Sequence, residues 1–465
     1  MTRLHFIGVG GSGMSAVAQL WVCRGATVTG TDKRRSAYFE ALEASGADVR
    51  VGHDASMVDG VDAVVISSAV RESNPELAAA RAAGIDVWHR SEALAKVLEG
   101  RRLVAVAGSH GKTTTSAMVA TALHGAGIDA SFAVGARVFG IEGAVAGGFG
   151  GVSDVAVVEA DESDGSFLRY QPEVAIITNI EIDHLDHYGS EDALIAAFAE
   201  FAASSKVLIV CADDPRAARL AGGLVAQGST DRAAPRVVTY GVGAADVVVT
   251  DSALVHGGVE YALRIPVPGA HNRLNAAAAW MAAVEMGADP HAAAAALATF
   301  AGTGRRFQVR GHARGITVID DYAHHPTEVA ALLAAARTSA NQRLVVLFQP
   351  ALFSRTQLLA TEFGAALSQP NTAVVLAPVH GDREDPIEGV SSELISAAVD
   401  LQPDQSLELA SSLEDAAQRA AHLAREGDIV LTVGSGTVTE AAQWILDAIQ
   451  QRAADSPPEF RAERR

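Results

Sequence analysis

The fold of this chain is decided by residues 103–114, which read Leu103-Val104-Ala105-Val106-Ala107-Gly108-Ser109-His110-Gly111-Lys112-Thr113-Thr114. The apolar residues at the start of this segment predict a buried strand, and the glycine-rich turn leads into a helix. Backbone N–H groups of such a turn converge on phosphate oxygens, and the helix N-terminus adds positive potential. We therefore expect residues 108–114 to bind nucleotide phosphates, with Lys112 neutralising charge and Thr113 binding Mg²⁺.

The segment departs at one position from the strict phosphate-loop pattern, which has glycine six residues before the lysine. Val106 stands there instead. The alternative interpretation is a glycine-rich turn that contains an incidental lysine. The position of the turn between a predicted strand and a predicted helix favours the phosphate site.

Similar alternations of strand and helix occur on both sides of this segment and indicate an α/β fold with parallel sheets. The predicted strands are Leu4–Val9, Ala26–Gly30, Ala63–Ile66, Leu103–Ala107, Val155–Val158, Val174–Thr178, Val207–Val210, Thr317–Asp320, Leu344–Phe348, Ala373–Ala377 and Ile429–Val433. We read residues 222–236 as a loop. A length of 465 residues favours about three domains. The predicted domains are a Rossmann-like domain (1–100), a phosphate-loop ATPase domain (101–310), a second Rossmann-like domain (311–450) and a flexible tail (451–465).

The composition excludes several classes of protein. The formal charge of −19 disfavours binding to nucleic acid or to acidic membranes. Cys23 and Cys211 stand far apart, so no disulfide framework or zinc site is predicted. Neither a signal sequence nor an apolar run of membrane-spanning length is visible. We expect a soluble cytoplasmic protein, as a monomer or weak dimer.

The N-terminus carries a second nucleotide signal. Gly8, Gly10 and Gly13 satisfy the dinucleotide fingerprint, and Asp32 follows about twenty residues later. This pattern alone usually indicates NAD binding and a dehydrogenase. A second phosphate loop in the next domain instead suggests that one nucleotide supplies the energy for the reaction and that the other is a part of the substrate by which the protein binds it.

Two acidic segments follow strands of the central domain. Residues 159–167 begin with Glu159, and residues 178–187 include His184 among three carboxylates. Because ligands of α/β sheets bind at the carboxyl ends of strands, the carboxylates of the first segment are candidate Mg²⁺ ligands, and the second segment could bind a second divalent ion with His184 as the preferred ligand. A solvated acidic loop is the alternative for the first segment, and a structural role for its histidines is the alternative for the second.

Further polar groups occur near other element ends. His271, Asn272 and Asn275 begin a predicted helix, where they suit adenine edges or phosphates, although helix capping by Asn272 is the alternative. The segments 304–308, 320–328 and 349–356 follow the same logic. Arg355 could stabilise a transferring phosphoryl group, and ordinary polar loops are the alternative.

Together these motifs resemble the Mur ligases, the ATP-dependent amide ligases of peptidoglycan precursor synthesis. The matching segments span about residues 4–360 and are Gly108–Thr114, Glu159–Asp164, Thr178–Asp186, Pro268–Ala276, Arg305–Gln308 and Asp320–Glu328. The run from His5 to Ser15 and the paired histidines His324 and His325 are similar to the alanine-adding branch. Many other Mur ligases carry a carbamylated lysine after the Asp-His-x-Asp motif, and none occurs between Asp186 and Lys206.

The resemblance implies a reaction and a set of roles. It implies ligation of L-alanine to the carboxylate of UDP-N-acetylmuramate through an acyl phosphate, with ATP and Mg²⁺ and with domain closure around the intermediate. The implied catalytic residues are Lys112, Glu159, His184, His324 as base, and Arg355, with Thr113, Glu159 and His184 as metal ligands. The implied ATP contacts are Gly108–Thr114, His271, Asn272, Asn275, Arg306 and Asp321. The implied UDP-sugar contacts are Gly10, Gly11, Ser12, Gly13, Met14, Asp32 and Ser67.

The last third of the chain departs from the family pattern. Ala351 stands where the family usually has histidine, residues 377–379 replace an Asp-Ile-Tyr-like run, and Thr437 replaces an aspartate. These departures concern the amino-acid site. The alternatives to alanine addition are a ligase that adds a peptide to the same UDP-sugar, a non-catalytic UDP-sugar binder and an NAD-dependent oxidoreductase.

Overall fold

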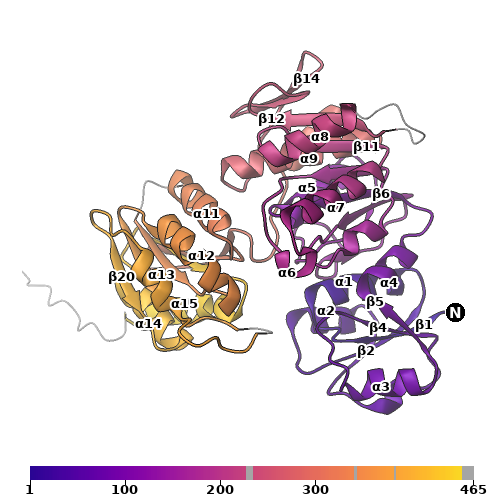
Figure 1. Cartoon of the computed structure of the whole chain (residues 1–465), viewed down its shortest axis with the longest axis horizontal. Helices are drawn as coiled ribbons and strands as arrows, with labels where there is room; N and C mark the ends of the chain where they lie inside the picture. Colours follow the sequence, from indigo (N-terminus) through magenta and orange to yellow (C-terminus); the bar gives the residue numbers. More distant parts are fainter. Residues whose placement is uncertain (227–233, 340–342, 382–383, 453–465) are drawn as a thin grey trace, which may run out of the picture. The chain divides into compact units, whose positions relative to one another are not determined.

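The computed structural model describes residues 1–226, 234–339, 343–381 and 384–452 (Figure 1). The predicted tail therefore lies outside the described residues from position 453 onward. The chain divides into two compact units, Met1–Gly304 and a second that begins at Arg305. Both units are α/β, which confirms the predicted fold class. No helix within the described ranges has the length and apolarity needed to cross a membrane.

The first sheet is parallel and has five strands. In spatial order they are β3 (Asp48–Val51), β2 (Thr27–Asp32), β1 (Arg3–Ile7), β4 (Ala63–Ile66) and β5 (Asp86–His89). Its helices are α1 (Ser12–Cys23), α2 (Ala37–Ala44), α3 (Pro75–Ala82) and α4 (Arg90–Val97). The prediction missed β3 and β5, because both are short edge strands without a buried apolar run.

The second sheet contains the phosphate-loop strand near its centre. In spatial order its strands are β15 (Val259–Ala262), β14 (Ala253–His256), β13 (Val247–Val249), β12 (Arg236–Gly241), β11 (Val207–Cys211), β10 (Val174–Ile177), β6 (Arg102–Ala107), β9 (Val155–Glu159), β7 (Ser131–Ala133) and β8 (Gly148–Phe149). The strands from β13 to β7 run parallel, and β14, β15 and β8 pair antiparallel.

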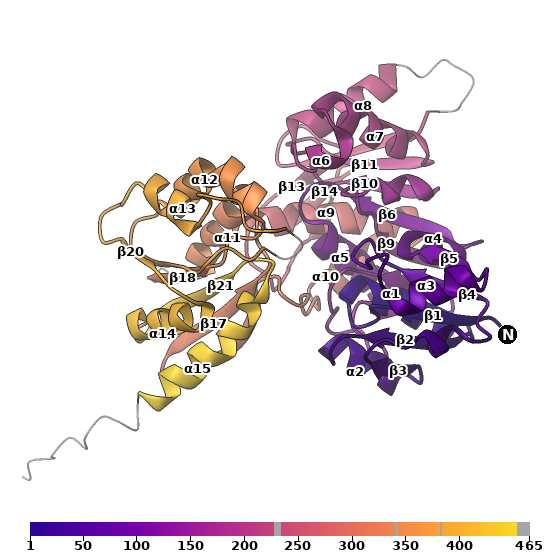
Figure 2. The same cartoon turned by 60° about the horizontal axis from the view of Figure 1, so that its bottom comes forward.

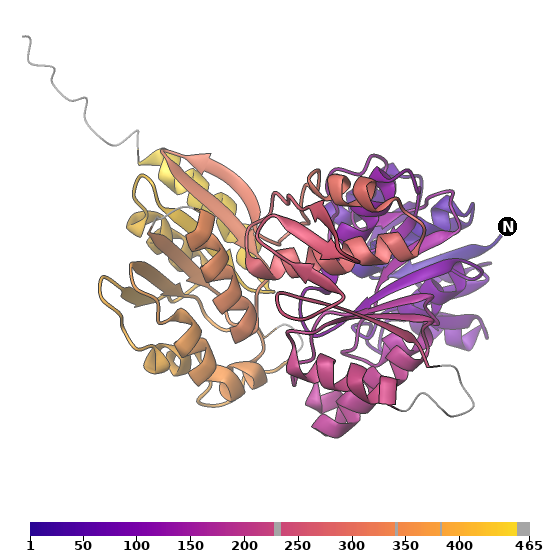
Figure 3. The same cartoon turned by 90° about the horizontal axis from the view of Figure 1, so that it is seen from above.

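Helices cover both faces of this sheet (Figure 3). On one face α7 (Glu191–Ala203) and α8 (Pro215–Ala226) pack on the strands. On the other face lie α5 (Lys112–Gly125), α9 (Ala270–Glu285) and α10 (Pro290–Leu297). The predicted loop at residues 222–236 was wrong at its start, because α8 buries Ala217, Leu220 and Ala221 and continues to Ala226. It was also wrong at its last residue, Arg236, which begins β12. Residues 227–233 of this prediction lie outside the described residues.

The two sheets of the first unit share a hydrophobic core. Helix α1 packs on β7 and β8 of the second sheet, and one buried cluster extends from Leu4 to Ala221. Residues on both sides of position 100 therefore form one compact unit. We propose that the first and second domains meet near this position but share their core.

The second unit holds a six-stranded sheet between two helical layers (Figure 2). Its strands in spatial order are β16 (Gln308–Ala313), β17 (Ile316–Asp321), β21 (Ile429–Val433), β18 (Leu344–Phe348), β19 (Thr372–Leu376) and β20 (Ser406–Leu409). One face packs against α11 (Pro326–Ser339), α12 (Phe353–Leu367) and α13 (Ser392–Ala398), and the other against α14 (Leu413–Leu423) and α15 (Ala441–Gln451). Because β16 already includes Gln308, we propose that this domain begins at Arg305 rather than at residue 311.

Candidate functional site

A cavity of 590 Å³ opens at the carboxyl ends of the first sheet's strands. Six of the residues expected at a UDP-sugar site line it, namely Gly11, Ser12, Gly13, Met14, Asp32 and Ser67. The seventh, Gly10, donates its backbone N–H to Asp32 Oδ2 at 2.9 Å. A Cβ atom at Gly10 would lie 3.0 Å from Asp32 Oδ2 and from Ser36 Oγ, so the close approach favours glycine.

The charges around this cavity suit an anionic ligand. Lys33, Arg71 and Arg90 line it, and the prediction named none of them. Helix α1 also begins here, and its N-cap Gly11 makes no side-chain capping hydrogen bond. The N–H groups of the first turn of α1, together with Lys33 and Arg71, form a site that suits a diphosphate.

His53 also lines the cavity, and its ring contacts the buried carboxylate of Glu76. Its Nδ1 lies 3.0 Å from Glu76 Oε2, and Thr31 Oγ1 donates to the same oxygen at 2.7 Å. Burial would raise the pKa of Glu76, but hydrogen bonds from His5, Thr31 and the Asp54 N–H outweigh it and lower the pKa to about 2. The ionised Glu76 therefore fixes the orientation of the His53 ring.

The phosphate loop connects β6 to α5 as predicted. Its two glycines adopt backbone conformations that favour glycine, with φ of +129° at Gly108 and +83° at Gly111. A Cβ atom at Gly108 would overlap the Thr178 hydroxyl. Val106 is fully buried within β6, so the chain departs from the strict pattern at a strand residue and the turn begins two residues later.

Lys112 lies folded over this loop. Its Nζ donates to the Gly108 and Ser109 carbonyls at 2.7 and 3.3 Å and to Glu162 Oε1 at 2.9 Å. Burial would lower the pKa of Lys112, but the carboxylates of Glu162, Asp161 and Glu159 outweigh it and raise the pKa. The lysine is therefore a positive charge at the position where phosphate oxygens would bind.

The first turn of α5 provides a candidate metal position. Thr113 Oγ1 donates to Glu159 Oε1 at 2.8 Å, and Glu159 Oε2 accepts from the Gly135 N–H at 2.7 Å. A hydroxyl and a carboxylate at this spacing are hard oxygen donors that fit Mg²⁺. The third expected ligand, His184, stands at φ +57° before α6 (Leu185–Tyr188), with Nε2 3.7 Å from Asp183 Oδ2.

The segment after β10 braces the phosphate loop from one side. Thr178 Oγ1 and Asn179 Nδ2 donate to the His110 carbonyl at 2.6 and 3.0 Å, and Asn179 Oδ1 accepts from the His110 N–H at 2.9 Å. His110 Nε2 lies 2.5 Å from Glu181 Oε2. The expected ATP contact His110 is thus held by the acidic segment that follows β10.

The start of α9 meets the same loop. Asn275 Oδ1 lies 2.8 Å from the point where a Cβ atom of Gly111 would stand, and Asn275 Nδ2 donates to Asn272 Oδ1 at 3.3 Å. Asn272 donates to the Pro268 carbonyl at 2.6 Å, whereas the N-cap of α9 is Gly269. The capping alternative for Asn272 was therefore wrong, and both buried asparagines form one network beside Gly111. His271 lies exposed on the first turn of α9.

In the second unit, polar side chains surround the end of β17. Asp321 accepts from the Phe307 and Ala323 N–H groups at 2.7 and 2.8 Å. Burial raises the pKa of Asp321 to about 6, against the opposing charge of Arg306. The Glu328 carboxylate accepts from the His324 N–H at 2.9 Å and lies 3.2 Å from His324 Nδ1, so it orients this imidazole.

The departures from the family pattern gather at the ends of β18, β19 and β21. Ala351 pairs with His380 in an isolated parallel bridge, and a Cβ atom at Gly436 would lie 2.6 Å from His380 Cγ. Arg305 donates to the carbonyls of Gly434, Ser435 and Gly436 at 2.6, 3.2 and 3.1 Å. His380 therefore lies on the segment that pairs with position 351. Arg355 lies in the first turn of α12.

Three domain families match the chain in succession. "Mur ligase family, catalytic domain" matches residues 3–102, "Mur ligase middle domain" residues 106–283, and "Mur ligase, glutamate ligase domain" residues 305–436. The UDP-N-acetylmuramate–L-alanine ligase of Paenarthrobacter aurescens is 49% identical over 460 residues, which cover 96% of this chain and 97% of that protein. The enzyme of the same name from Renibacterium salmoninarum is 48% identical, with 97% of each chain covered.

A solved structure supports the same relationship. The crystal structure of the UDP-N-acetylmuramate–alanine ligase from Thermotoga maritima matches with a TM-score of 0.77 and 28% identity. The match covers 97% of this chain and all of that chain.

Proposed function

The chain belongs to the Mur ligase family, and from this membership we propose that it joins L-alanine to the carboxylate of UDP-N-acetylmuramate, with conversion of ATP to ADP and phosphate. This is a step of peptidoglycan precursor synthesis. The observation that carries the proposal is the phosphate loop, in which Lys112 and the Thr113–Glu159 pair lie side by side. The cavity at the N-terminal glycine loop supports a second, nucleotide-bearing substrate in the same unit.

The reaction has two steps. A carboxylate oxygen of the muramate attacks the γ-phosphorus of ATP, the bond between phosphorus and the ADP oxygen breaks, and an acyl phosphate forms. The nitrogen of L-alanine then attacks the acyl carbon, the carbon–oxygen bond to phosphate breaks, and the amine loses a proton. Both steps need stabilisation of phosphate charge, and the second needs a proton acceptor.

Residues of the first unit meet the first requirement. Lys112 carries a charge that carboxylates stabilise, and the α5 N-terminus directs N–H groups at the same place. Thr113 and Glu159 would hold Mg²⁺, which neutralises phosphate charge when it is bound. We propose that His184 completes this metal site.

Residues of the second unit would serve the nucleotide and the amine. We propose Asp321 and Arg306 as ATP contacts, Arg355 as a stabiliser of the transferring phosphoryl group, and His324 as the proton acceptor. The orientation of His324 by Glu328 supports the last of these roles, because a general base needs a fixed ring.

The test is phosphate release from ATP and Mg²⁺ in the presence of UDP-N-acetylmuramate, with each amino acid added singly and with a tripeptide. We expect release that requires the sugar nucleotide and is fastest with L-alanine. Faster release with the tripeptide would assign a peptide-adding ligase. Nucleotide binding without release under any condition would contradict the ligase function.

A further inference from the structure

Arg90 lines two cavities of the first unit. It is the first residue of α4 and follows β5. One side of its guanidinium group faces the larger cavity, the one of 590 Å³ at the carboxyl ends of the first sheet's strands. There Nη1 lies so close to Gly13 that a Cβ atom at this glycine would overlap it. On the other side Nη2 lies 3.8 Å from Asp161 Oδ2. Arg90 therefore connects the glycine loop of the first sheet with the acidic segment that follows β9.

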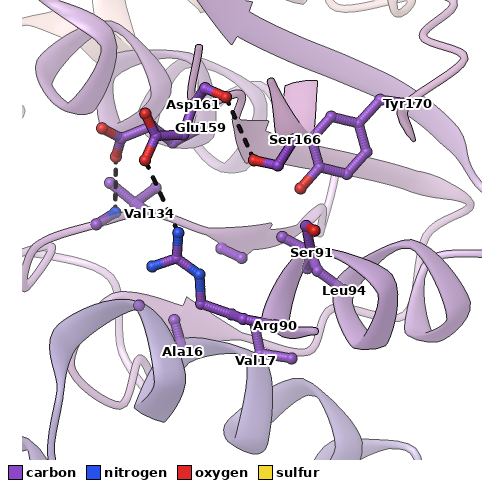
Figure 4. Close-up of a pocket in the computed structure, with 13 residues that line it drawn as sticks. Ala16, Val17, Arg90, Ser91, Leu94, Val134, Glu159, Asp161, Ser166 and Tyr170 are labelled. Carbon is purple, nitrogen blue, oxygen red and sulfur yellow. Dashed lines mark hydrogen bonds and ion pairs between the residues drawn. The ribbon is translucent and has the colours of Figure 1, made fainter. Parts of the chain in front are cut away.

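The second cavity lies between the two sheets and has a volume of 90 Å³, which is room for several water-sized groups (Figure 4). Its polar lining consists of the Glu159 and Asp161 carboxylates, the hydroxyls of Ser91, Ser166 and Tyr170, and Arg90. Among the described residues that line it, Arg90 is the one cationic side chain. Glu159 is also the partner of Thr113, so this cavity borders the candidate metal position.

An anionic group that enters this cavity needs a compensating positive charge, because two carboxylates line the cavity. Glu159 and Asp161 would repel a carboxylate that approaches the phosphate loop from the sugar-nucleotide side. A guanidinium group compensates such repulsion well, because its planar fork can donate two parallel hydrogen bonds to a carboxylate.

The ion pair between Arg90 and Asp161 is long. The separation of 3.8 Å from Asp161 exceeds hydrogen-bond distance, and both side chains are about one third exposed. At this separation no direct hydrogen bond joins the two groups, so Arg90 can exchange Asp161 for another carboxylate without losing one.

We propose that Arg90 recognises the carboxylate of the sugar-nucleotide substrate and positions it beside the phosphate loop. The inference rests on the proposed function, because it assumes a UDP-sugar that carries a carboxylate. It adds a residue that selects substrates by this group. When the substrate binds, its carboxylate replaces Asp161 as the partner of Arg90, and its UDP portion binds in the larger cavity.

The proposal predicts a difference between two ligands. UDP-N-acetylglucosamine shares the nucleotide and the N-acetylated hexose with UDP-N-acetylmuramate but lacks the carboxylate. We expect the Arg90→Ala variant to bind UDP-N-acetylmuramate about 10- to 100-fold more weakly, as for loss of hydrogen bonds to a charged group. Its binding of UDP-N-acetylglucosamine should change by less than about threefold, since the remaining contacts persist. Arg90→Lys, which keeps the charge but loses the fork, should fall between.

The measurement is calorimetric titration of the full chain with each sugar nucleotide, for wild type, both Arg90 variants and Arg71→Ala. Arg71 lines the larger cavity but not the smaller one, so its loss should weaken both ligands equally. Retained binding of UDP-N-acetylglucosamine shows that a variant is folded. If Arg90→Ala does not fold, the comparison of the two ligands is made with Arg90→Lys. Equal weakening of both ligands by the Arg90 variants, or no weakening, would overturn the proposal. So would a wild type that binds both ligands equally, whereas a wild type that binds neither would overturn the proposed function itself.

Discussion

The Lys112 ammonium lies 2.9 Å from the Glu162 carboxylate, which is almost fully buried beside the phosphate loop. Nucleotide phosphates that bind the loop would compete with Glu162 for this charge. Lys112 is therefore protonated when a nucleotide arrives, because the surrounding carboxylates raise its pKa.

Replacement of Lys112 by alanine should reduce kcat/KM for ATP by about 100-fold or more, as for other groups that stabilise charge in a transition state. The measurement is phosphate release with UDP-N-acetylmuramate and L-alanine. Lys206→Ala is the matched control, since that lysine is exposed and pairs with Glu173. A Lys112→Ala variant with activity near that of wild type would contradict the assignment of the loop.

The Thr113–Glu159 pair should set the requirement for Mg²⁺. Thr113→Ala removes one oxygen donor, and we expect the Mg²⁺ concentration for half-maximal activity to rise by about tenfold or more. Thr113→Ser keeps the hydroxyl that contacts Glu159 and should restore the wild-type requirement. The measurement is a Mg²⁺ titration of phosphate release at saturating ATP, and an unchanged midpoint in Thr113→Ala would place the metal elsewhere.

The phosphate loop was predictable because its strand, turn and helix are contiguous in the sequence. The larger cavity was predicted only in part, since its residues follow five separate parallel strands. Gly8–Ser12 follow β1, Asp32 ends β2 and Ser67 follows β4, and all three strands were predicted from the sequence. His53 follows β3 and Arg90 follows β5, the two edge strands that the prediction missed. Once those strands are placed, the parallel order brings both side chains to the same edge of the sheet.

His380 illustrates a different limit. The sequence shows that position 351 lacks the usual histidine, but the bridge between Ala351 and His380 joins the ends of two strands and depends on their pairing. A contact of this kind follows from the register of the sheet, which no local pattern contains.

Glu76 should stabilise the first unit in a pH-dependent way. Its folded pKa of about 2 lies below the ordinary value, so its contribution is fully present above about pH 4.5 and is lost as pH falls toward 2. Glu76→Gln should lower the free energy of unfolding by about 3 kcal/mol at pH 7. Urea unfolding followed at pH 7 and pH 3 checks this, with the exposed Glu72→Gln as control. An equal loss at both pH values would show that the charge of Glu76 is not responsible.

Asp321 has the opposite linkage, because burial raises its pKa to about 6. The folded unit binds more protons than the unfolded chain between about pH 4 and 6. The free energy of unfolding therefore falls as pH rises through this window and levels off above it.

The same group should shape the pH dependence of the reaction. Ionised Asp321 accepts two N–H groups and holds residues 307 and 323 together, so activity should rise with pH through about 6. Arg306 opposes the raised pKa, and Arg306→Ala should therefore move this limb to higher pH even where it also lowers the maximal rate. Arg310→Ala is the control, because Arg310 pairs with Asp320 instead. The measurement is the pH profile of phosphate release for the three proteins. A limb that stays in place in Arg306→Ala, or moves equally in Arg310→Ala, would assign it to another group.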